Sequence, residues 1–183
     1  MPLPVAHGLL GATVVGALQS SEVFKRNWKE LLLGACLGVC PDFDYFLNYI
    51  PGSGGGWHHG FTHSFVFAFL LGALASGLAG RWKLKELMMF SLATLSHPLL
   101  DFFFTESRGI ELFWPFSYWR FKLLIPSPID YSWRTTSLSA TALDLVKISL
   151  KELIIFAPVV SVVLWLKRPN GGSQISRMFN VFN

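Results

Sequence analysis

The chain has 183 residues, of which 52% are apolar and 14% are charged. Because charged residues make up about 25% of an ordinary soluble domain, this composition excludes a disordered chain and argues against a soluble one. The formal net charge is +4. The Lys and Arg residues stand in short groups beside apolar blocks, whereas a nucleic-acid-binding protein gathers them on one face or tail. The sequence therefore predicts a membrane protein that binds no nucleic acid.

Five apolar blocks predict the membrane-embedded helices. They cover residues 5–18, 31–50, 61–79, 84–104 and 150–166. A helix needs about 17–25 residues to cross a bilayer, and the second, third and fourth blocks provide them. The first block is short, and the fifth is short and contains a proline, so these two could be tilted, partly buried or re-entrant. We expect an all-α, polytopic integral membrane helix bundle with about five spans.

Small residues recur four positions apart along three of the blocks, so each set lies on one face of a helix. Such faces let helix backbones approach closely in lipid. They therefore predict a compact bundle. The sets are Gly8, Ala12 and Gly16; Gly34 and Gly38; and Gly72, Ser76 and Gly80.

Two further segments differ from the apolar blocks. Residues 105–149 are rich in aromatic side chains, and Trp and Tyr favour the headgroup level of a membrane, so we expect an interfacial cap there. The tail at 170–183 is polar and contains glycine, which predicts a flexible C-terminus. Residues 1–169 are then a single membrane-embedded helical domain.

The Lys and Arg residues orient the predicted bundle. With five spans, segments 19–30, 81–83 and 167–183 share one side of the membrane and hold a dense set of these residues, whereas the 51–60 loop has none. The positive-inside rule places the dense set in the cytoplasm. We therefore expect a multi-pass protein of the cell inner membrane whose N-terminus, 51–60 loop and cap face outward.

Histidines and aspartates collect at the outer end of this predicted bundle. Four separate regions of the sequence deliver them to one depth of one side. The spans are predicted from apolarity and their orientation from Lys and Arg. The placement of these histidines and aspartates at one end is therefore a partly independent check on the predicted bundle. The eight residues are His7; Asp42 and Asp44; His58, His59 and His63; and His97 and Asp101.

The spacing and chemistry of these eight residues indicate a metal site. His97 and Asp101 are four positions apart, as are His59 and His63, so a helix can present either pair on one face. A carboxylate such as Asp101, followed by three phenylalanines, is costly in lipid and is functional by default. Histidine combined with carboxylate suits zinc, manganese or iron better than magnesium or calcium.

Eight candidates exceed what one tetrahedral site needs. We therefore expect one or two divalent metal ions, with zinc as the first choice and manganese or iron as alternatives. Two ions would lie about 3.5–4 Å apart, bridged by a carboxylate such as Asp101 or Asp42. No nucleophile motif competes, because the chain has no G-x-S-x-G, and the glycine-rich run at 51–56 lacks the closing Gly-Lys-Ser/Thr of a Walker loop.

Several motifs together resemble the YdjM-like family, which is described as membrane-bound metal-dependent hydrolases, LexA-regulated in the founding case. The resemblance covers roughly residues 1–118. The motifs are His7, Pro41-Asp42-Phe43-Asp44, His58-His59-Gly60-Phe61-Thr62-His63-Ser64 and His97-Pro98-Leu99-Leu100-Asp101, followed by Thr105, Gly109, Pro115 and Phe116.

One position departs from the family pattern, which usually has His-Arg before Gly-Phe-Thr-His-Ser. His59 stands in the place of that arginine, so His58 and His63 are the matched ligands. His59 then either adds a ligand or takes over a charge or hydrogen-bonding role. The family is distantly similar to zinc-dependent phospholipase C enzymes, and this similarity implies phosphoester chemistry at one remove.

These observations together predict a metal-dependent hydrolase that acts on a lipid or lipid-linked phosphoester at the outer face of the membrane. The expected metal ligands are His7, Asp42, Asp44, His58, His63, His97 and Asp101. Asp44, as a ligand or general base, His59 and Asp101 are the expected catalytic residues. Arg108 or Arg120 would steady a phosphate, because each lies near the site end of the cap.

Two alternatives remain open from the sequence. One is a metal-binding membrane protein without catalysis, such as a sensor or carrier. The inner halves of the predicted spans are nearly all apolar, which disfavours a carrier but not a sensor. The other is a structural membrane subunit whose His–Asp network holds no metal. The sequence leaves the oligomeric state open.

Overall fold

The computed structural model describes residues 2–19, 28–51, 57–104, 108–123, 125, 129 and 138–166. These residues form helices and irregular segments, and the only β-type pairing among them is an isolated bridge between Ile110 and Phe121. The all-α class is therefore confirmed. The elements are α1 (Pro4–Leu18), α3 (Trp28–Val39), the 3₁₀ helix η1 (Cys40–Tyr49), the 3₁₀ helix η2 (Phe61–His63), α4 (Phe65–Leu78), α5 (Leu84–Phe104) and α6 (Leu138–Leu166).

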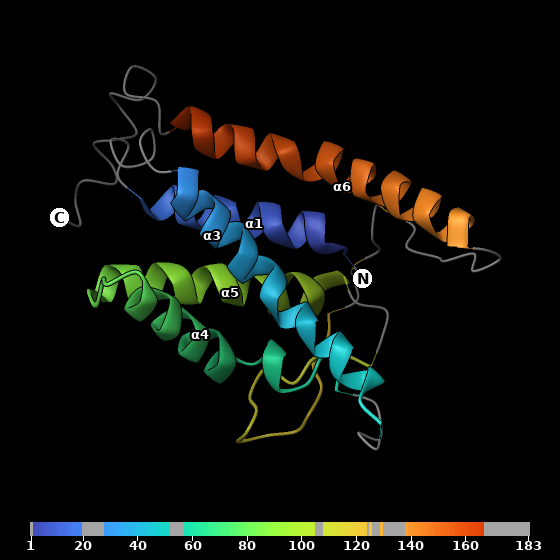
Figure 1. Cartoon of the computed structure of the whole chain (residues 1–183), viewed down its shortest axis with the longest axis horizontal. Coiled ribbons are helices and arrows are strands. Elements are labelled where there is room, and N and C mark those ends of the chain that lie inside the picture. The colour runs from blue at the N-terminus through green and yellow to red at the C-terminus, as the bar shows by residue number, and fades with distance from the viewer. Residues whose placement is uncertain are drawn as a thin grey trace.

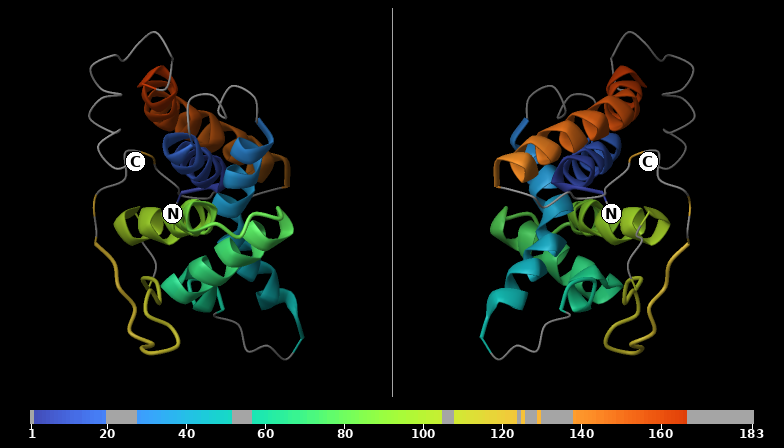
Figure 2. Two further views of the ribbon diagram at one scale, coloured as in Figure 1. Left: turned by 90° about the vertical axis from the view of Figure 1, so that its left-hand side faces the viewer. Right: turned by 90° about the vertical axis from the view of Figure 1, so that its right-hand side faces the viewer.

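Helix α5 occupies the middle of the bundle. It packs against α1 and α3 on one side and against α4 on the other (Figure 1). Helix α6 runs along α1 at the outer edge of the bundle. The two end-on views in Figure 2 give the same order, with α6 outermost, α1 beneath it and α4 on the far side. The bundle thus brings the ends of several helices together at each of its two ends.

The helix boundaries follow local chemical signals. Helix α1 begins at Pro4, whose fixed φ and missing N–H suit the first position of a helix. The second apolar block changes from α to 3₁₀ geometry at Cys40, next to Pro41, which cannot donate a backbone hydrogen bond. Helix α4 begins after Ser64, whose hydroxyl oxygen accepts a hydrogen bond from the Phe67 backbone N–H at 3.1 Å.

Glycines bring α1 and α3 into direct backbone contact. A Cβ atom on Gly38 would lie 2.4 Å from the carbonyl oxygen of His7, and one on Gly11 would lie 2.3 Å from the carbonyl oxygen of Gly34. Both distances are too short for real atoms, so only glycine permits this approach. The predicted small-residue contact is confirmed for α3. It sets the end of α3 directly against the first turns of α1.

The structure differs from the prediction in the C-terminal part of the cap. Helix α6 begins at Leu138, so residues 138–149 are helical and continuous with the fifth apolar block. Asp144 and Lys147 reduce the apolarity of this stretch, yet they are compatible with a helix because they lie three positions apart, with Oδ1 and Nζ at 3.9 Å.

The number of spans is only partly supported. Among the described residues, one helix, α5, is long and apolar enough to cross a membrane, while α1 and α4 are apolar but shorter. A five-span bundle is therefore not confirmed. The predicted flexible tail at 170–183, most of the glycine-rich run, Thr105 and the cap residues 105–107, 126–128 and 130–137 lie outside the described residues.

Candidate metal centre

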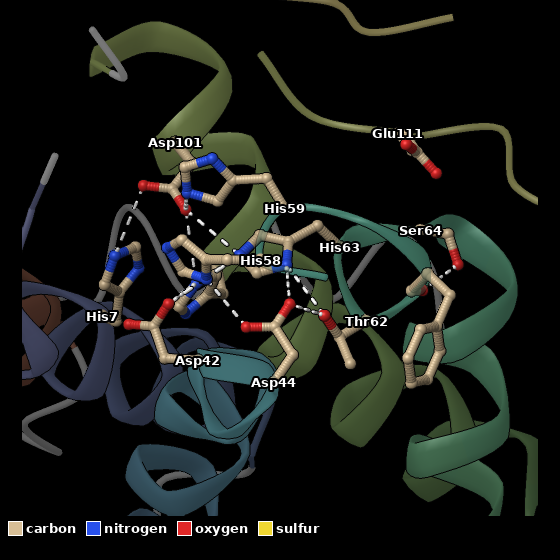
Figure 3. A network of polar contacts seen from close by, with 12 residues as sticks. His7, Asp42, Asp44, His58, His59, Thr62, His63, Ser64, Asp101 and Glu111 are labelled. Carbon is tan, nitrogen blue, oxygen red and sulfur yellow. Dashed lines mark hydrogen bonds and ion pairs between the residues drawn. The ribbon is translucent and has the colours of Figure 1, made fainter. Parts of the chain in front are cut away.

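One end of the bundle gathers all eight predicted histidines and aspartates into a single group, here called the His–Asp cluster (Figure 3). The first turn of α1 contributes one histidine, η1 both early aspartates, the segment around η2 three histidines, and the last turns of α5 a histidine and an aspartate. This meeting follows from chain direction, because α1 and α4 begin at this end whereas α3 and α5 finish there. The members are His7, Asp42, Asp44, His58, His59, His63, His97 and Asp101.

Four members of the cluster, here called the four-ligand group, converge with one ligand atom each. They are Asp42, His63, His97 and Asp101. The Nε2 atom of His97 lies 3.1 Å from Nε2 of His63, 3.3 Å from Oδ1 of Asp42 and 3.4 Å from Oδ2 of Asp101. The Nε2 atom of His63 lies 3.4 Å from Oδ2 of Asp101 and 3.9 Å from Oδ1 of Asp42. Ligand atoms at ~2.0–2.2 Å from a tetrahedral zinc lie about 3.3–3.6 Å from one another. Three of the five separations fall in this range, and the pairs at 3.1 Å and 3.9 Å lie close to it, so the group is near the geometry of such a site.

Several buried polar atoms of the cluster make no hydrogen bond within the described part of the chain. They include both carboxylate oxygens of Asp101, both ring nitrogens of His7 and Oδ1 of Asp42. The side chains of Asp101 and His7 are fully buried, and Nε2 of His7 lies 3.6 Å from Oδ1 of Asp101. Because unsatisfied buried polar atoms are rare in proteins and a buried carboxylate is costly, this arrangement fits a bound cation.

Hydrogen bonds behind two of the histidines turn their Nε2 atoms toward the four-ligand group. The Nδ1 atom of His97 lies 2.7 Å from the carbonyl oxygen of Gly38. A carbonyl can only accept, so Nδ1 carries the proton and Nε2 offers its lone pair. On His63, Nδ1 lies 3.0 Å from the Thr62 hydroxyl, which in turn donates to Asp44. Protein metal sites use such second contacts to orient their histidine ligands.

Asp44 lies behind the histidines rather than within the four-ligand group. Its Oδ1 atom is 2.7 Å from Nδ1 of His58, and its Oδ2 atom is 3.4 Å from Nδ1 of His63. The Thr62 hydroxyl also donates a hydrogen bond to Oδ2. The carboxylate is thus placed to orient two rings, while its expected role as ligand or base stays a prediction.

His59 occupies an unusual backbone conformation that turns its ring into the cluster. Its φ is 66°, in the left-handed region that most side chains avoid. The ring stacks on that of His58 with centroids 4.0 Å apart, and Nε2 lies 3.6 Å from Oδ2 of Asp101. Burial lowers the pKa of His59 to about 3, so the ring is neutral at pH 7. It can bind a metal together with His58 and His63, or accept a proton.

The two predicted phosphate-binding arginines make no ion pair with the aspartates of the His–Asp cluster within the described residues. Arg120 pairs with Glu111, with Nη2 and Oε1 at 2.8 Å and Nε and Oε1 at 3.1 Å. The Glu111 side chain stands apart from the His–Asp cluster in Figure 3, and its backbone N–H donates to the His59 carbonyl oxygen at 3.0 Å. Arg108 is exposed beyond the end of α5. Their role in substrate binding stays a prediction.

Two residues that the sequence interpretation missed support the cluster. Thr62 links Asp44 to His63, and the only signal for it is its place inside the quoted Gly-Phe-Thr-His-Ser motif. Glu152 on α6 is fully buried and accepts hydrogen bonds from the backbone N–H groups of Leu3 and, at 3.1 Å, Ala6. It therefore caps the first turn of α1, directly before His7. Its only sequence signal is a carboxylate inside an apolar block.

A cavity of about 550 Å³ leads to the cluster. It is lined by Leu3, Pro4, Val39, Asp42, Phe43, Tyr45, Phe46 and His58. The side chains of Asp42 and His58 are 16% and 17% exposed, against 2% or less for the other six members of the cluster. The cavity is therefore an approach from outside to the buried ligands.

Comparison with known proteins places the chain in a family. None of the curated proteins and none of the solved structures matches it. One family model, described as YdjM inner membrane protein, matches residues 1–171 and so includes every member of the His–Asp cluster. The match confirms the resemblance drawn from the sequence motifs and supports the inner-membrane location. The chain belongs to the YdjM inner membrane protein family.

Proposed function

We propose that the protein is a metal-dependent hydrolase that cleaves a lipid or lipid-linked phosphoester at the outer face of the inner membrane. The observation that carries the proposal is the four-ligand group, in which five pairs of ligand atoms lie 3.1–3.9 Å apart, close to the edges of a tetrahedral site. The unsatisfied oxygens of Asp101 supply an independent argument for a cation. Both features arise from the residues that the family motifs contain.

The donor set indicates which metals fit. Two imidazoles and two carboxylates at tetrahedral spacing suit zinc, with manganese or iron as alternatives. A second ion would use His58 and His59, which converge with His63, a member of the first group, and of which His59 also faces Asp101. A bound divalent ion supplies polarisation of the phosphoryl group and acidification of a water molecule.

The chain's own residues account for the remaining chemistry. With one ion bound, His59 is not a ligand, and its ring accepts the proton that water loses as the water oxygen bonds to phosphorus. The same proton then goes to the ester oxygen as the P–O bond breaks and the alcohol leaves. Asp44 holds the rings of His58 and His63 in place throughout. The buried surroundings of Asp101 exclude bulk water and strengthen these electrostatic interactions.

The position of the site supports an outward-facing active centre. The connection between α4 and α5, which carries Arg81 and Lys83, lies at the opposite end of the bundle, because α4 starts beside the cluster and α5 finishes there. The positive-inside rule assigns that basic end to the cytoplasm. A multi-pass arrangement and an outer-leaflet substrate are part of this proposal.

Hydrolysis by purified protein in lipid nanodiscs tests the proposal. The protein is stripped with a chelator, reloaded with zinc, manganese or iron, and assayed for release of p-nitrophenol from bis(p-nitrophenyl) phosphate. We expect activity only after reloading, and its loss in Asp101→Asn. Asp144→Asn, the same change on the outer side of α6, is the matched control and keeps full activity. Hydrolysis that survives both chelation and Asp101→Asn would overturn the proposal.

A metal-binding protein without catalysis gives a different result in the same experiment. It would take up the metal stoichiometrically and yet release no product from any phosphoester. This outcome would favour a sensor over a hydrolase.

A further inference from the structure

We propose that the cavity beside the His–Asp cluster binds the hydrocarbon chain of a phosphoester-bearing lipid, with the phosphate against the cluster and the chain between the start of α1 and η1. The placement of the phosphate against the His–Asp cluster rests on the proposed function. The binding site for the hydrocarbon chain, here called the chain site, rests on the cavity itself, so the two proposals can fail separately.

The walls of the cavity match an amphiphilic ligand. Six of the eight lining residues are apolar or aromatic, namely Leu3, Pro4, Val39, Phe43, Tyr45 and Phe46. The other two, Asp42 and His58, belong to the His–Asp cluster. A volume of about 550 Å³ lies within the usual range of small-molecule sites. A sugar phosphate or nucleotide would leave its polar groups unpaired against these walls, whereas a hydrocarbon chain would not.

The 3₁₀ geometry of η1 creates the aromatic wall. Residues three positions apart lie above one another in a 3₁₀ helix, so Phe43 and Phe46 line up along one edge, with ring centroids 6.1 Å apart. Both are more than half exposed, at 60% and 62%. Tyr45 packs edge-on against His58 with centroids 5.7 Å apart. The aromatic wall therefore runs from the molecular surface to a member of the cluster.

The cavity also fixes the order in which a ligand meets the protein. Asp42 and His58 line the cavity and are the two least buried members of the cluster. A head group that enters along the cavity therefore reaches these two first. A lipid whose chain stays in the cavity keeps its phosphate at the cluster, which is the positioning that a hydrolase needs.

Photolabelling tests the chain site without any need for hydrolysis. The probe is dodecylphosphonate with a diazirine at the chain end, added to zinc-loaded protein in nanodiscs. We expect labels on Leu3, Val39 or Phe46 that excess dodecylphosphonate removes, and labels on the surface residue Phe69 of α4 that it does not. Equal labelling of the cavity and Phe69, insensitive to competitor, would overturn the proposal.

A matched pair of variants measures the contribution of the wall. Phe46→Ser and Phe69→Ser make the same change at two exposed phenylalanines, 62% and 51% exposed, of which only Phe46 lines the cavity. We expect Phe46→Ser to weaken dodecylphosphonate binding about tenfold, the effect of losing much of one aromatic contact. Phe69→Ser should leave binding unchanged. Equal affinities in both variants and the wild type would contradict the chain site.

A variant that fills the cavity distinguishes binding inside the cavity from non-specific binding to an apolar surface. Val39→Phe adds apolar surface and removes space, so it should weaken binding of dodecylphosphonate but not of methylphosphonate. Tighter dodecylphosphonate binding would contradict the chain site.

Competition by phosphatidylglycerol or by a polyprenyl phosphate then identifies which class of lipid supplies the chain. If the label behaves as expected and no phosphoester is hydrolysed, the proposed function fails and the chain site stands.

Discussion

The two ends of the bundle each bury a group of polar side chains, but they satisfy those groups differently. At the basic end, Glu30 accepts hydrogen bonds from Gln19 and Arg81, so the carboxylate of α3 has protein donors on both oxygens. At the other end, the oxygens of Asp101 face histidine nitrogens at 3.4–3.6 Å without forming a hydrogen bond. The carboxylate of Glu30 is therefore satisfied by protein donors, whereas the carboxylate of Asp101 is in the state that a bound cation would satisfy.

The largest expected effect is the loss of the carboxylate at the centre of the cluster. Asp101→Asn keeps the shape of the side chain and removes its charge. We expect zinc affinity to fall by more than the ~10–100-fold that the loss of an outer contact costs. Competition with a fluorescent zinc chelator measures this directly. An unchanged affinity in a folded variant would show that Asp101 is no ligand.

A smaller effect is expected from the residue behind the ligands. Asp44→Asn leaves the four-ligand group intact but weakens the contacts to Nδ1 of His58 and His63. We expect zinc affinity to fall about 10–100-fold. Zinc titration by the same competition measures the change, and Asp144→Asn is the control. A loss as large as that in Asp101→Asn would instead make Asp44 a direct ligand.

A still smaller effect is expected from the cap of α1. Glu152→Gln keeps one acceptor oxygen for the N–H groups of Leu3 and Ala6 but replaces the other by an NH2 donor, and it removes the negative charge that favours a helix N-terminus. We expect zinc affinity to fall about threefold to tenfold, because His7 follows directly. Glu152→Ala loses both hydrogen bonds and should lower the zinc affinity further than Glu152→Gln does. Equal zinc affinity in all three proteins would limit Glu152 to stability.

No effect on metal binding is expected from the basic end. Arg81→Met removes one of the two hydrogen-bond donors to the buried carboxylate of Glu30, so the variant should lose about 1–2 kcal/mol of stability. Thermal unfolding measures that loss, and the zinc content should stay at the wild-type value. A fall in zinc content in the folded variant would mean that the two ends are not independent.

The sequence predicts the parts of this structure that depend on local patterns. The bounds of α5 agree with the fourth apolar block, because its apolar run ends at the same residues that end the helix. The end of the bundle that holds the cluster is also predicted, because successive helices run in opposite directions. This alternation brings His7, Asp42 and Asp101 to one end regardless of how the helices pack. The residue types, histidine and aspartate, directly give the metal-donor atoms of the cluster.

The parts that depend on tertiary contacts could not be predicted. Pro41 signals a break in the second block, but nothing local selects a ten-residue 3₁₀ helix over a loosened α-helix. Glu152 meets Leu3 from the far end of the chain, and Arg120 finds Glu111 through the bridge between Ile110 and Phe121. The start of α6 at Leu138 is obscured by its charged residues, which face outward on the helix.

The metal content of the purified protein tests the central claim most directly. Wild type and the double variant His97→Ala/Asp101→Ala are prepared side by side in detergent without chelator, and zinc, manganese and iron are counted per chain. The structure predicts one or two ions per wild-type chain and none in the folded double variant. A folded wild-type protein that carries no metal and takes up none when it is added would contradict the claim that the His–Asp cluster is a metal site.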